Sequence, residues 1–538
     1  MVVTMRTDDP FKTRLARNGS ELEVPAPKRP RGCQRGLHCC SVQEEYPMLL
    51  KCDKSDSDRI TAIPFAVYGS EARLPVQDSI CGRDEAPTNY SVVPVDDILR
   101  ATCVGKHECI INPRSLGDPS HGRTKVLKVR WECFSDSKCV PSAGRPLSNL
   151  PLRVENNVIV DRTGSRVRLK GVNWSGAHNI HFVPGGLDVS PLSDIVRQIR
   201  LLEFNFVRLT FSTAMVLTNP TVEYRKVAAN PNLVGMRALE VFDEVIKALA
   251  DEGLLILVDN HMHDNDWCCG FDDCNGMWFN ADYTTSDWVS SLANIAARYN
   301  HIPAVFAVGL KNEPRHVENP HECRMSQYVE SPNGTDTSLT YQWSAGPQEL
   351  QYRSAMELAG AAVLKQNLHV LVSISGLDYS QHLEDAEFAP IRLPSGRFFY
   401  EAHEYAWYDD WEIAYTRGST LDPNQYHAKL TKQWGYLLKR RIAPVLVSEF
   451  GMAHEFRQGH QEGDWFDAFS RYVQADGPLA AQGGLDWAYW QLGGVQQGGR
   501  GRTEGERESY GIMNQCWTGP MGETHFAAVS SLMRSPAY

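Results

Sequence analysis

Long apolar runs are missing from this sequence of 538 residues. No stretch reaches the roughly 18 apolar residues that a transmembrane helix needs, so we expect no membrane span. The first 32 residues are polar and lack the apolar core of a secretory signal, so no signal peptide is readable there. An excess of positive charge is missing too, because 54 Lys and Arg residues face 65 Asp and Glu residues. This balance disfavours nucleic acid as a partner, since phosphate backbones select basic surfaces.

Several catalytic motifs are also missing. No GxSxG elbow occurs, which disfavours acyl transfer through a serine nucleophile, and no HExxH motif occurs. No Gly-rich phosphate turn follows the first strand-like run, which disfavours an open nucleotide-binding sheet. His261 and His263 could bind a metal, but no matching carboxylate pattern accompanies them. We therefore expect neither a metal nor a cofactor.

Cysteine, by contrast, is plentiful. Nine of the 14 cysteines lie before residue 140, which predicts a small disulfide-stapled domain in front of a larger one. The length also exceeds what one hydrophobic core normally serves. The cysteines favour an extracellular location, and so do four N-x-S/T sequons at Asn18, Asn89, Asn173 and Asn333.

The chain is expected to have four parts. Residues 1–45 are rich in Pro, Lys, Arg and Ser and predict disorder. Residues 46–134 alternate short apolar runs with turn residues, which is typical of a small α+β domain. Residues 135–152 are rich in Ser, Pro and Gly and read as a linker, and residues 153–538 form the large domain.

The large domain shows a repeated strand–helix pattern. Near-continuous apolar runs alternate with amphipathic stretches, as in α/β proteins whose parallel strands are covered by helices. Eight such units over about 385 residues predict a (β/α)8 TIM barrel with enlarged loops. The runs are 167–174, 204–211, 254–261, 305–314, 369–376, 397–405, 444–451 and 484–492, and the expected helices include 192–203, 238–253, 286–300, 348–366 and 424–441.

Polar residues stand at the ends of these runs, where the catalytic groups of such barrels lie. Glu313 ends the fourth run and Glu449 the seventh, and we predict that they face each other. Two carboxylates about 5 Å apart are what retaining glycoside hydrolysis needs. Either glutamate alone could instead be a salt-bridged structural residue, and a barrel that only binds carbohydrate is the alternative of another class. Further candidates at the same mouth are Arg208, His261, Asn312, His403, Tyr405 and Trp490.

The two glutamates must differ in pKa to play two roles. The nucleophile must stay ionised, whereas the general acid must keep its proton. Arg208 and Tyr405 are suitable hydrogen-bond donors for one carboxylate, and Trp490 could form the floor beneath a sugar ring.

Residues 153–538 resemble glycoside hydrolase family 5, the cellulase and mannanase family of retaining (β/α)8 enzymes. The matching motifs are "VRL" at 207–209, "LVDNH" at 257–261, "NEP" at 312–314, "HEY" at 403–405 and "SEFG" at 448–451, with Trp490 as the aromatic of the eighth strand. The resemblance implies that Glu313 is the acid/base, that Glu449 is the nucleophile and that Arg208 supports it. It also implies that Asn312 contacts the sugar 2-hydroxyl and that no cofactor is needed.

The substrate expected from this resemblance is a β-glycan. An endo-β-1,4-glucanase is the first choice, and a β-mannanase, a β-1,3-glucanase or a glycosyl-lipid hydrolase are alternatives, because loops rather than motif residues decide the sugar. The net charge of -11 suits a neutral polysaccharide. We expect a monomer.

The loop after the third strand has an unusual composition. Cys268, Cys269 and Cys274 could form a metal site or a disulfide loop, and the spacing favours a disulfide loop because it resembles no zinc motif. Trp267 and Trp278 are expected as sugar platforms, with ordinary packing as the alternative.

Residues 49–133 resemble the rhamnose/galactose-binding lectin domain of SUEL type. The matching stretches are "AVYGS" at 66–70, "CVGKHECII" at 103–111 and "LGDPSHGRTKVLKVRWEC" at 116–133. Ser70 replaces an Arg of the family pattern and Ser120 replaces a Cys, so the fold is better supported than the lectin activity. If the domain binds a galactose- or rhamnose-type glycan, the resemblance implies Tyr68, Asp118 and Lys125 as its site.

Overall fold

The computed structural model describes most of residues 149–533. Its gaps there are 330–337, 409–421, 454–460, 475–476, 480, 482, 518 and 522. Before residue 149 it describes 14–17, 20–23, 36–43, 48–51, 59–70, 92–104, 106, 108–116 and 125–134.

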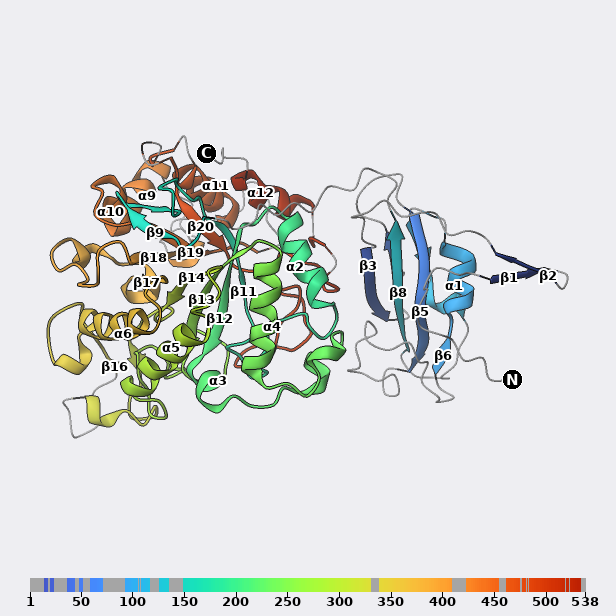
Figure 1. Ribbon diagram of the computed structural model, residues 1–538, viewed down its shortest axis with the longest axis horizontal. Helices are drawn as coiled ribbons and strands as arrows, with labels where there is room; N and C mark the ends of the chain where they lie inside the picture. The colour runs from blue at the N-terminus through green and yellow to red at the C-terminus, as the bar shows by residue number, and fades with distance from the viewer. Residues whose placement is uncertain are drawn as a thin grey trace.

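Eight parallel strands close into a barrel, as the sequence predicts (Figure 1). Each strand falls within one of the eight apolar runs, apart from single residues at the ends of β12 and β13. The strands are β11 Lys170–Trp174, β12 Phe206–Ser212, β13 Leu255–Met262, β14 Val305–Gly309, β17 Leu371–Ser375, β18 Phe398–Glu404, β19 Val445–Phe450 and β20 Asp486–Tyr489.

The strand register brings the polar strand ends to one mouth. Asn173 pairs with Arg208, Asp259 pairs with Gly309, and His403 pairs with Glu449. Because neighbouring strands are parallel, residues that end them lie at the same end of the barrel. Almost every strand residue is buried, which explains why the runs are apolar on both faces.

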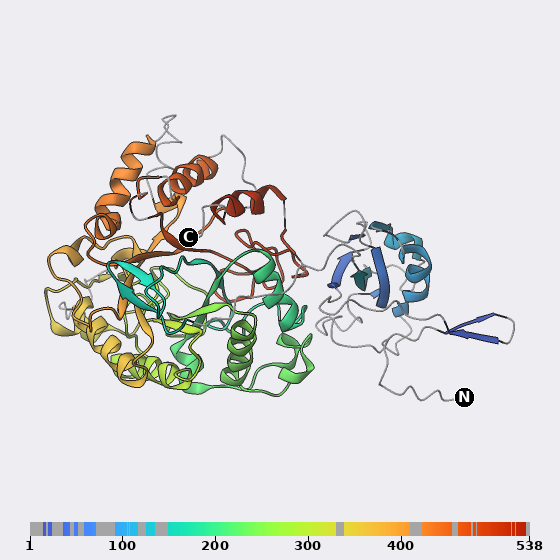
Figure 2. The same ribbon diagram turned by 45° about the horizontal axis from the view of Figure 1, so that its top comes forward.

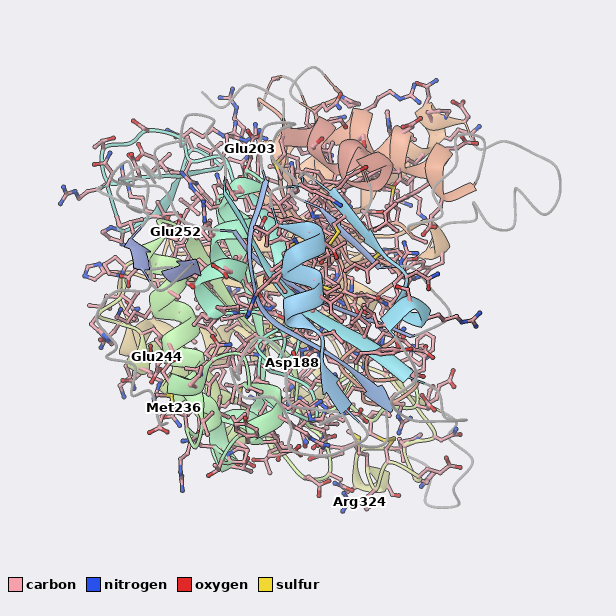
Figure 3. The ribbon with its side chains drawn as sticks, turned by 90° about the vertical axis from the view of Figure 1, so that its right-hand side faces the viewer. Asp188, Glu203, Met236, Glu244, Glu252 and Arg324 are labelled. Carbon is pink, nitrogen blue, oxygen red and sulfur yellow. A yellow bond between two sulfur atoms is a disulfide. The ribbon has the colours of Figure 1, made fainter. Side chains whose placement is uncertain are left out.

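Amphipathic helices surround the strands (Figure 2). In α4, seven apolar side chains are buried towards the barrel. Figure 3 shows Glu244 on this helix and Glu252 just beyond its end. No helix in the described part of the chain is long and apolar enough to cross a membrane. The main helices are α2 Leu192–Leu201, α4 Ala238–Asp251, α5 Thr285–Arg298, α6 Tyr352–Gln366, α9 Pro423–Leu430, α10 Tyr436–Lys439, α11 Gln461–Val473 and α12 Glu523–Met533.

A hairpin closes the opposite end of the barrel. Strands β9 Arg153–Glu155 and β10 Val158–Val160 pair antiparallel. Leu152 and Ile159 from this region form one apolar cluster with barrel residues such as Phe206. Only the mouth at the carboxyl ends of the strands is therefore left for a polar site.

Two helical details differ from expectation. The segment 376–397 contains only α7 Leu377–Ser380 and a 3-10 turn Glu384–Glu387, so the fifth strand is followed by no long helix. The expected helix 424–441 is divided by a π-helical turn at Thr431–Gly435. At Gly435 a Cβ atom would collide with the Tyr472 hydroxyl, so the close contact with α11 requires glycine there.

The N-terminal part has its own small core, as expected for a separate domain. A four-stranded antiparallel sheet has the order β3-β8-β5-β6, and helix α1 Asp96–Cys103 packs on β5. The disulfide Cys103–Cys109 joins this helix to β7 Glu108–Ile111. The sheet strands are β3 Gly36–Gln43, β5 Arg59–Ser70, β6 Val92–Pro94 and β8 Lys125–Phe134, while β4 Met48–Lys51 pairs with β7.

The hairpin β1 Arg14–Arg17 and β2 Ser20–Glu23 and most of β3 lie within residues 1–45, where composition predicts disorder. Strand β3 is ordered by an eight-residue ladder with β8, a long-range pairing that composition cannot reveal. Most of the expected linker, 135–148, lies outside the described residues.

Of the lectin-site candidates, only the side chain of Tyr68 lies within the described residues. Tyr68 is 1% exposed and belongs to the small core, so its expected role in sugar contact is corrected to packing. It lies on the face of β5 that packs inward, together with Ala66. Asp118 and the side chain of Lys125 lie outside the described residues.

Candidate active site

Glu449 lies in β19 and is held by two donors. Its Oε1 accepts a hydrogen bond from Arg208 Nη1 at 2.5 Å, and its Oε2 accepts one from the Tyr405 hydroxyl at 3.2 Å. His403 Nδ1 lies 3.7 Å from the same Oε2. Arg208 and Tyr405 are the two donors that the sequence predicts for one carboxylate of the pair.

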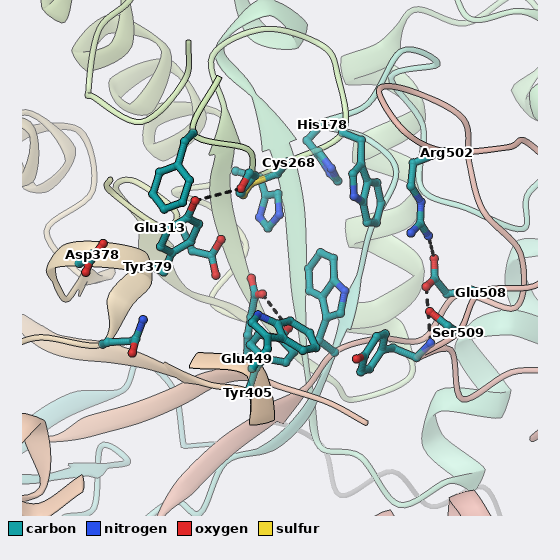
Figure 4. A pocket seen from close by; sticks show the side chains of 18 residues that line it. His178, Cys268, Glu313, Asp378, Tyr379, Tyr405, Glu449, Arg502, Glu508 and Ser509 are labelled. Atoms are coloured by element: carbon teal, nitrogen blue, oxygen red, sulfur yellow. Dashed lines mark hydrogen bonds and ion pairs between the residues drawn. A yellow bond between two sulfur atoms is a disulfide. The ribbon is translucent and has the colours of Figure 1, made fainter. Parts of the chain in front are cut away.

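Glu313 follows β14 and faces Glu449 across the mouth (Figure 4). Its Oε1 lies 2.8 Å from His403 Nδ1, and His403 Nε2 lies 3.0 Å from the Ser448 hydroxyl. One carboxylate oxygen of Glu313 and one of Glu449 lie within 4.8 Å of each other. The backbone of Glu313 has a φ of 41°, a left-handed conformation that costs free energy and is common at functional sites.

Arg208 is the centre of the charge network beneath the pair. It is fully buried, and it also contacts Asp259 Oδ1 at 2.9 Å and Glu401 Oε2 at 3.3 Å. Together with the bond to Glu449, these acids raise the pKa of Arg208 although burial lowers it, so the guanidinium stays charged. Arg208 therefore supplies a fixed positive charge next to the proposed nucleophile.

Two asparagine side chains also accept hydrogen bonds from Arg208. Nη1 donates to Asn173 Oδ1 at 3.1 Å, and Nη2 donates to Asn312 Oδ1 at 2.8 Å. Asn312 is fully buried, and its amide nitrogen lies 3.7 Å and 3.6 Å from the sulfurs of Cys268 and Cys269. Asn312 thus lies beside the two facing glutamates, and its contact with a sugar 2-hydroxyl stays a prediction.

Burial and neighbouring charges set the protonation of the pair. Burial raises the pKa of Glu449 to about 7, against the opposite pull of His403 and Arg208. Burial lowers the pKa of His403, but the carboxylates of Glu449 and Glu313 outweigh it, so the net shift is upward. Burial therefore opposes the ionised form of Glu449, and the positive charges of His403 and Arg208 favour it.

His261 forms part of the wall next to the pair. Its Nδ1 lies 2.8 Å from Asp259 Oδ2, and its ring stacks on Trp490 with centroids 5.2 Å apart. Burial lowers the pKa of His261 well below its usual value, so the ring is neutral. His261 and Trp490 therefore present one stacked surface to the pocket.

The pocket has a volume of about 570 Å³ and contains most of the predicted site. Glu313, Glu449, His261, Tyr405, Trp490 and Trp267 line it, while Asn312, Arg208 and His403 lie directly behind. Trp278 does not line it. Its ring is 1% exposed and packs against Tyr341 and Tyr352 in the core, so the expectation of a sugar platform there is wrong.

Several pocket residues escaped the sequence analysis. Trp407 stacks on Tyr405 with centroids 4.4 Å apart, and the aromatic run "YAWY" after the sixth strand was an available signal. Glu401 was missed because it lies in the middle of β18, although it contacts Arg208. The others come from loops far apart in the chain and carried no signal; they are His178, Phe271, Asp378, Tyr379, Gln381, Arg502, Glu508, Ser509 and Tyr510.

The loop after β13 is stapled, as predicted. Cys274 is joined to Cys323, and Cys268 is bonded to Cys269 at the edge of the pocket. Two groups bring three metal-binding atoms within 4.8 Å, namely His261 with the two adjacent cysteines, and Glu313, His403 and Glu449.

Paired carboxylates at the mouth of a (β/α)8 barrel, flanked by aromatic rings, define the site of a glycoside hydrolase. The cellulase model, glycosyl hydrolase family 5, matches residues 160–496. The chain belongs to this family.

Curated relatives agree with this assignment. A glycosyl hydrolase 5 family protein of Chamaecyparis obtusa is 28% identical over 396 residues, which cover 69% of this chain and 64% of the relative. An endoglucanase of Paenibacillus polymyxa is 25% identical, covering 63% of this chain and 78% of that protein. The major extracellular endoglucanase of Xanthomonas campestris pv. campestris is 26% identical, covering 59% and 61%. The chain thus spans somewhat less than two thirds of the first and third of these relatives.

Solved structures share the fold. The catalytic domain of the major endoglucanase from Xanthomonas campestris pv. campestris has a TM-score of 0.56 at 24% identity, covering 71% of this chain and 99% of that chain. A cellotetraose complex of an endocellulase from Pyrococcus horikoshii has a TM-score of 0.57 at 22% identity, covering 71% and 98%.

Proposed function

We propose that this protein hydrolyses β-glycosidic bonds with retention of configuration. The main support for a retaining mechanism is the short distance between Glu313 and Glu449, whose nearest carboxylate oxygens lie within 4.8 Å of each other. A retaining enzyme holds its carboxyls about 5 to 5.5 Å apart, whereas an inverting enzyme needs about 6.5 to 9.5 Å for a water molecule.

In the first step, Glu449 attacks the anomeric carbon while Glu313 gives its proton to the leaving oxygen. A covalent bond forms between the sugar and Glu449, and the glycosidic bond breaks. In the second step, Glu313 removes a proton from water, which displaces Glu449 and releases the sugar. Glu313 ends each cycle protonated again, and Glu449 ends it ionised.

The surrounding residues fit these roles. Arg208 and Tyr405 donate to Glu449 and favour its ionised form, against the effect of burial. His403 contacts both carboxylates and is held by Ser448, so it can stabilise negative charge as it moves between them. Trp490 offers an apolar face for a sugar ring beside the pair.

The proposed substrate is a neutral β-glucan, cleaved as by an endo-β-1,4-glucanase. The names of the relatives from Paenibacillus and Xanthomonas support this choice. β-Mannan, β-1,3-glucan and glycosyl-lipids are the alternatives. An extracellular location is proposed as well, since one relative is named an extracellular endoglucanase.

The N-terminal domain is proposed to hold the enzyme on its polymer. A bound module raises the effective concentration of the barrel at an insoluble surface. The proposal rests on its resemblance to a galactose- or rhamnose-binding lectin, and its glycan is to be identified by binding to immobilised sugars.

The decisive experiment follows the anomeric form of new products by NMR. The full chain is incubated with soluble β-1,4-glucan, β-1,3-glucan, mixed-linkage glucan and β-mannan. We expect β-anomers first from one of these polymers, and Glu449→Gln should lower the rate by about 1,000-fold or more. First appearance of α-anomers would contradict retention. Unchanged cleavage by Glu449→Gln would contradict the assigned nucleophile, and binding without cleavage by the unaltered protein would favour the non-catalytic alternative.

A further inference from the structure

The loop after β20 brings an ion pair to one end of the pocket. Arg502 and Glu508 both line the pocket. Figure 4 shows them on one side, Asp378 and Tyr379 on the other, and the two catalytic glutamates between. The sequence motifs of the family do not include this loop.

Arg502 is held in a defined position. Its guanidinium lies 4.1 Å from the centre of the Trp267 ring, and it forms an ion pair with Glu508. The two side chains are 15% and 2% exposed. The Glu508 carboxylate also lies 3.5 Å from the backbone nitrogen of Tyr510. A stacked and paired guanidinium loses most of its freedom before a ligand arrives, which lowers the entropy cost of binding.

One donor of this guanidinium is unused. Nε of Arg502 is buried and has no hydrogen-bond partner among the described residues. Nε is closed off from the pocket, so a ligand would meet the rest of the Arg502 side chain, which is 15% exposed and lines the pocket. Arg502 also covers a face of Trp267, so this ring orients the cation rather than offering that face to sugar.

The pair matches a neutral ligand better than an anionic one. Glu508 balances the charge of Arg502, so the pair attracts no net charge. It offers a donor from Arg502 and acceptor oxygens from Glu508, which is what a sugar hydroxyl needs. A uronic acid or another anionic sugar would meet the Glu508 carboxylate and be repelled.

The position of the pair indicates which part of the substrate it meets. Glu313 gives its proton to the leaving oxygen, and Figure 4 places Glu313 towards Tyr379. The leaving sugars therefore extend towards Tyr379 and Asp378. The remaining part of the substrate, the glycone, extends in the opposite direction, past Trp490. The ring centroids of Trp490 and Trp267 are 6.1 Å apart, and Arg502 lies on the Trp267 ring, so the glycone extends towards Arg502.

We propose that Arg502, fixed by Trp267 and Glu508, is a specificity-determining residue that binds hydroxyl groups of a neutral sugar on the glycone side of the cleavage point. This inference rests on the proposed hydrolysis of a β-glucan. It gives the loop after β20 a role in substrate choice. Through Arg502, this loop would distinguish substrates with two or more glycone sugars from shorter ones.

The test measures kcat/KM on 4-nitrophenyl β-glucoside, β-cellobioside and β-cellotrioside. Arg502→Ala and Arg502→Lys are compared with Arg500→Ala, a matched control in the same loop. Arg500 is 51% exposed, pairs with Asp272 and does not line the pocket. We expect Arg502→Ala to lower kcat/KM by about 10- to 100-fold on the longest substrate, and by progressively less as the glycone shortens. Arg502→Lys should fall between, since it keeps the charge but loses the planar donors.

Each outcome decides between the alternatives. An equal loss on all three substrates, or no loss on any, would overturn the inference while leaving the proposed function intact. No hydrolysis by the unaltered protein would defeat the proposed function itself. Should Arg502→Ala fail to fold, as judged by circular dichroism, Arg502→Lys carries the test alone.

A second variant tests the charge argument. Glu508→Gln leaves Arg502 as an uncompensated cation. We expect the ratio of kcat/KM for carboxymethylcellulose to that for cellotetraose to rise about 3-fold or more. An unchanged or lower ratio would overturn the claim that Glu508 selects neutral sugar.

Discussion

At Glu449, burial and hydrogen bonding act on the same carboxyl group in opposite directions. Burial raises its pKa to about 7, while Arg208 and His403 favour the ionised form. The Tyr405 hydroxyl donates to it as well, at 3.2 Å. Burial and the individual donors together therefore set the pH at which Glu449, the proposed nucleophile, becomes ionised.

Tyr405→Phe should move the acid limb of activity to higher pH. The hydroxyl stabilises the ionised carboxylate, so its loss raises the pKa of Glu449 further. We expect the lower pKa of the kcat/KM profile on soluble β-glucan to rise by about 0.5 to 1 unit. Tyr299→Phe is the control, because that hydroxyl contacts Asp243 and does not line the pocket. A downward shift in Tyr405→Phe would contradict the assigned hydrogen bond.

Glu449→Gln should stabilise the barrel at high pH. The folded pKa of Glu449 is about 7 and its ordinary value is 4.5, so the folded state binds the extra proton. The stability that this proton contributes is complete below pH 4.5 and is lost as the pH rises through 7. Glutamine does not titrate, so the variant should gain up to about 3 kcal/mol relative to the unaltered protein between pH 4.5 and 8. Calorimetric Tm values across this pH range measure the difference in stability between Glu449→Gln and the unaltered protein.

The matched control for that measurement is Glu349→Gln, at an exposed position. Its Tm difference from the unaltered protein should stay constant with pH. If the Glu449→Gln difference is also constant, the raised pKa of Glu449 is refuted.

Among the elements, the loop after β13 contributes most to the pocket outside the strands. It places Trp267, Cys268, Cys269 and Phe271 on the wall of the pocket. A disulfide and an ion pair join this loop to the segment after β14. The disulfide is Cys274–Cys323, and the buried ion pair is formed by Arg315 and Asp273.

Replacing Cys274 and Cys323 together by Ser should lower the free energy of unfolding of the barrel. The bond closes a loop of 49 residues, for which chain entropy predicts about 2 to 4 kcal/mol. The catalytic pair does not depend on this bond directly, so kcat at low temperature should fall much less than stability. Chemical denaturation checks the first point and steady-state kinetics the second.

The double replacement of Cys103 and Cys109 is the control, because that disulfide belongs to the N-terminal core. It should leave the unfolding transition of the barrel in place. A loss of barrel stability equal to that of the Cys274 and Cys323 variant would show that the effect is not local.

At the scale of the whole molecule, the described chain has three clusters of buried apolar residues, and none of them includes residues of both the N-terminal part and the barrel. One set runs from Leu50 to Trp131, and the others lie between Leu152 and Met533. Separate cores are the mark of domains that can fold independently.

A chain that starts at residue 149 should therefore keep the Tm of the barrel and its kcat on soluble β-glucan. Its activity on an insoluble polymer should fall, by a factor that the affinity of the N-terminal domain sets. Sedimentation with the insoluble polymer and calorimetry measure both effects. Loss of the barrel transition on truncation would contradict the independence of the two cores.

Some of the site could be predicted because its residues end strands. Glu313, Glu449 and His403 lie at or near the ends of apolar runs, and parallel strands must bring such ends together. Arg208 lies within β12, where its pairing with Asn173 places it near the same mouth. Alternation along one strand also explains why Glu404 lies among the helices, where Trp434 donates to it at 2.8 Å.

The loops could not be predicted in the same way. Trp267 and Trp278 lie in one loop and looked equivalent, yet the first lines the pocket and the second is buried in the core. Arg502 lies in a Gly-rich loop with no periodic pattern, and only its contacts with Trp267 and Glu508 reveal a role. Loop positions depend on packing between distant segments, and no local repeat reports that.

By itself, the amino-acid sequence determined the barrel and the pair of carboxylates proposed as catalytic, because strand and helix periodicities are local and parallel strands share one open end. The tertiary structure alone decided which rings and charges surround that pair, and hence the raised pKa of Glu449. The physical reason is that burial and electrostatic energy depend on distances between segments that lie far apart in the chain, such as Glu449 and Arg208.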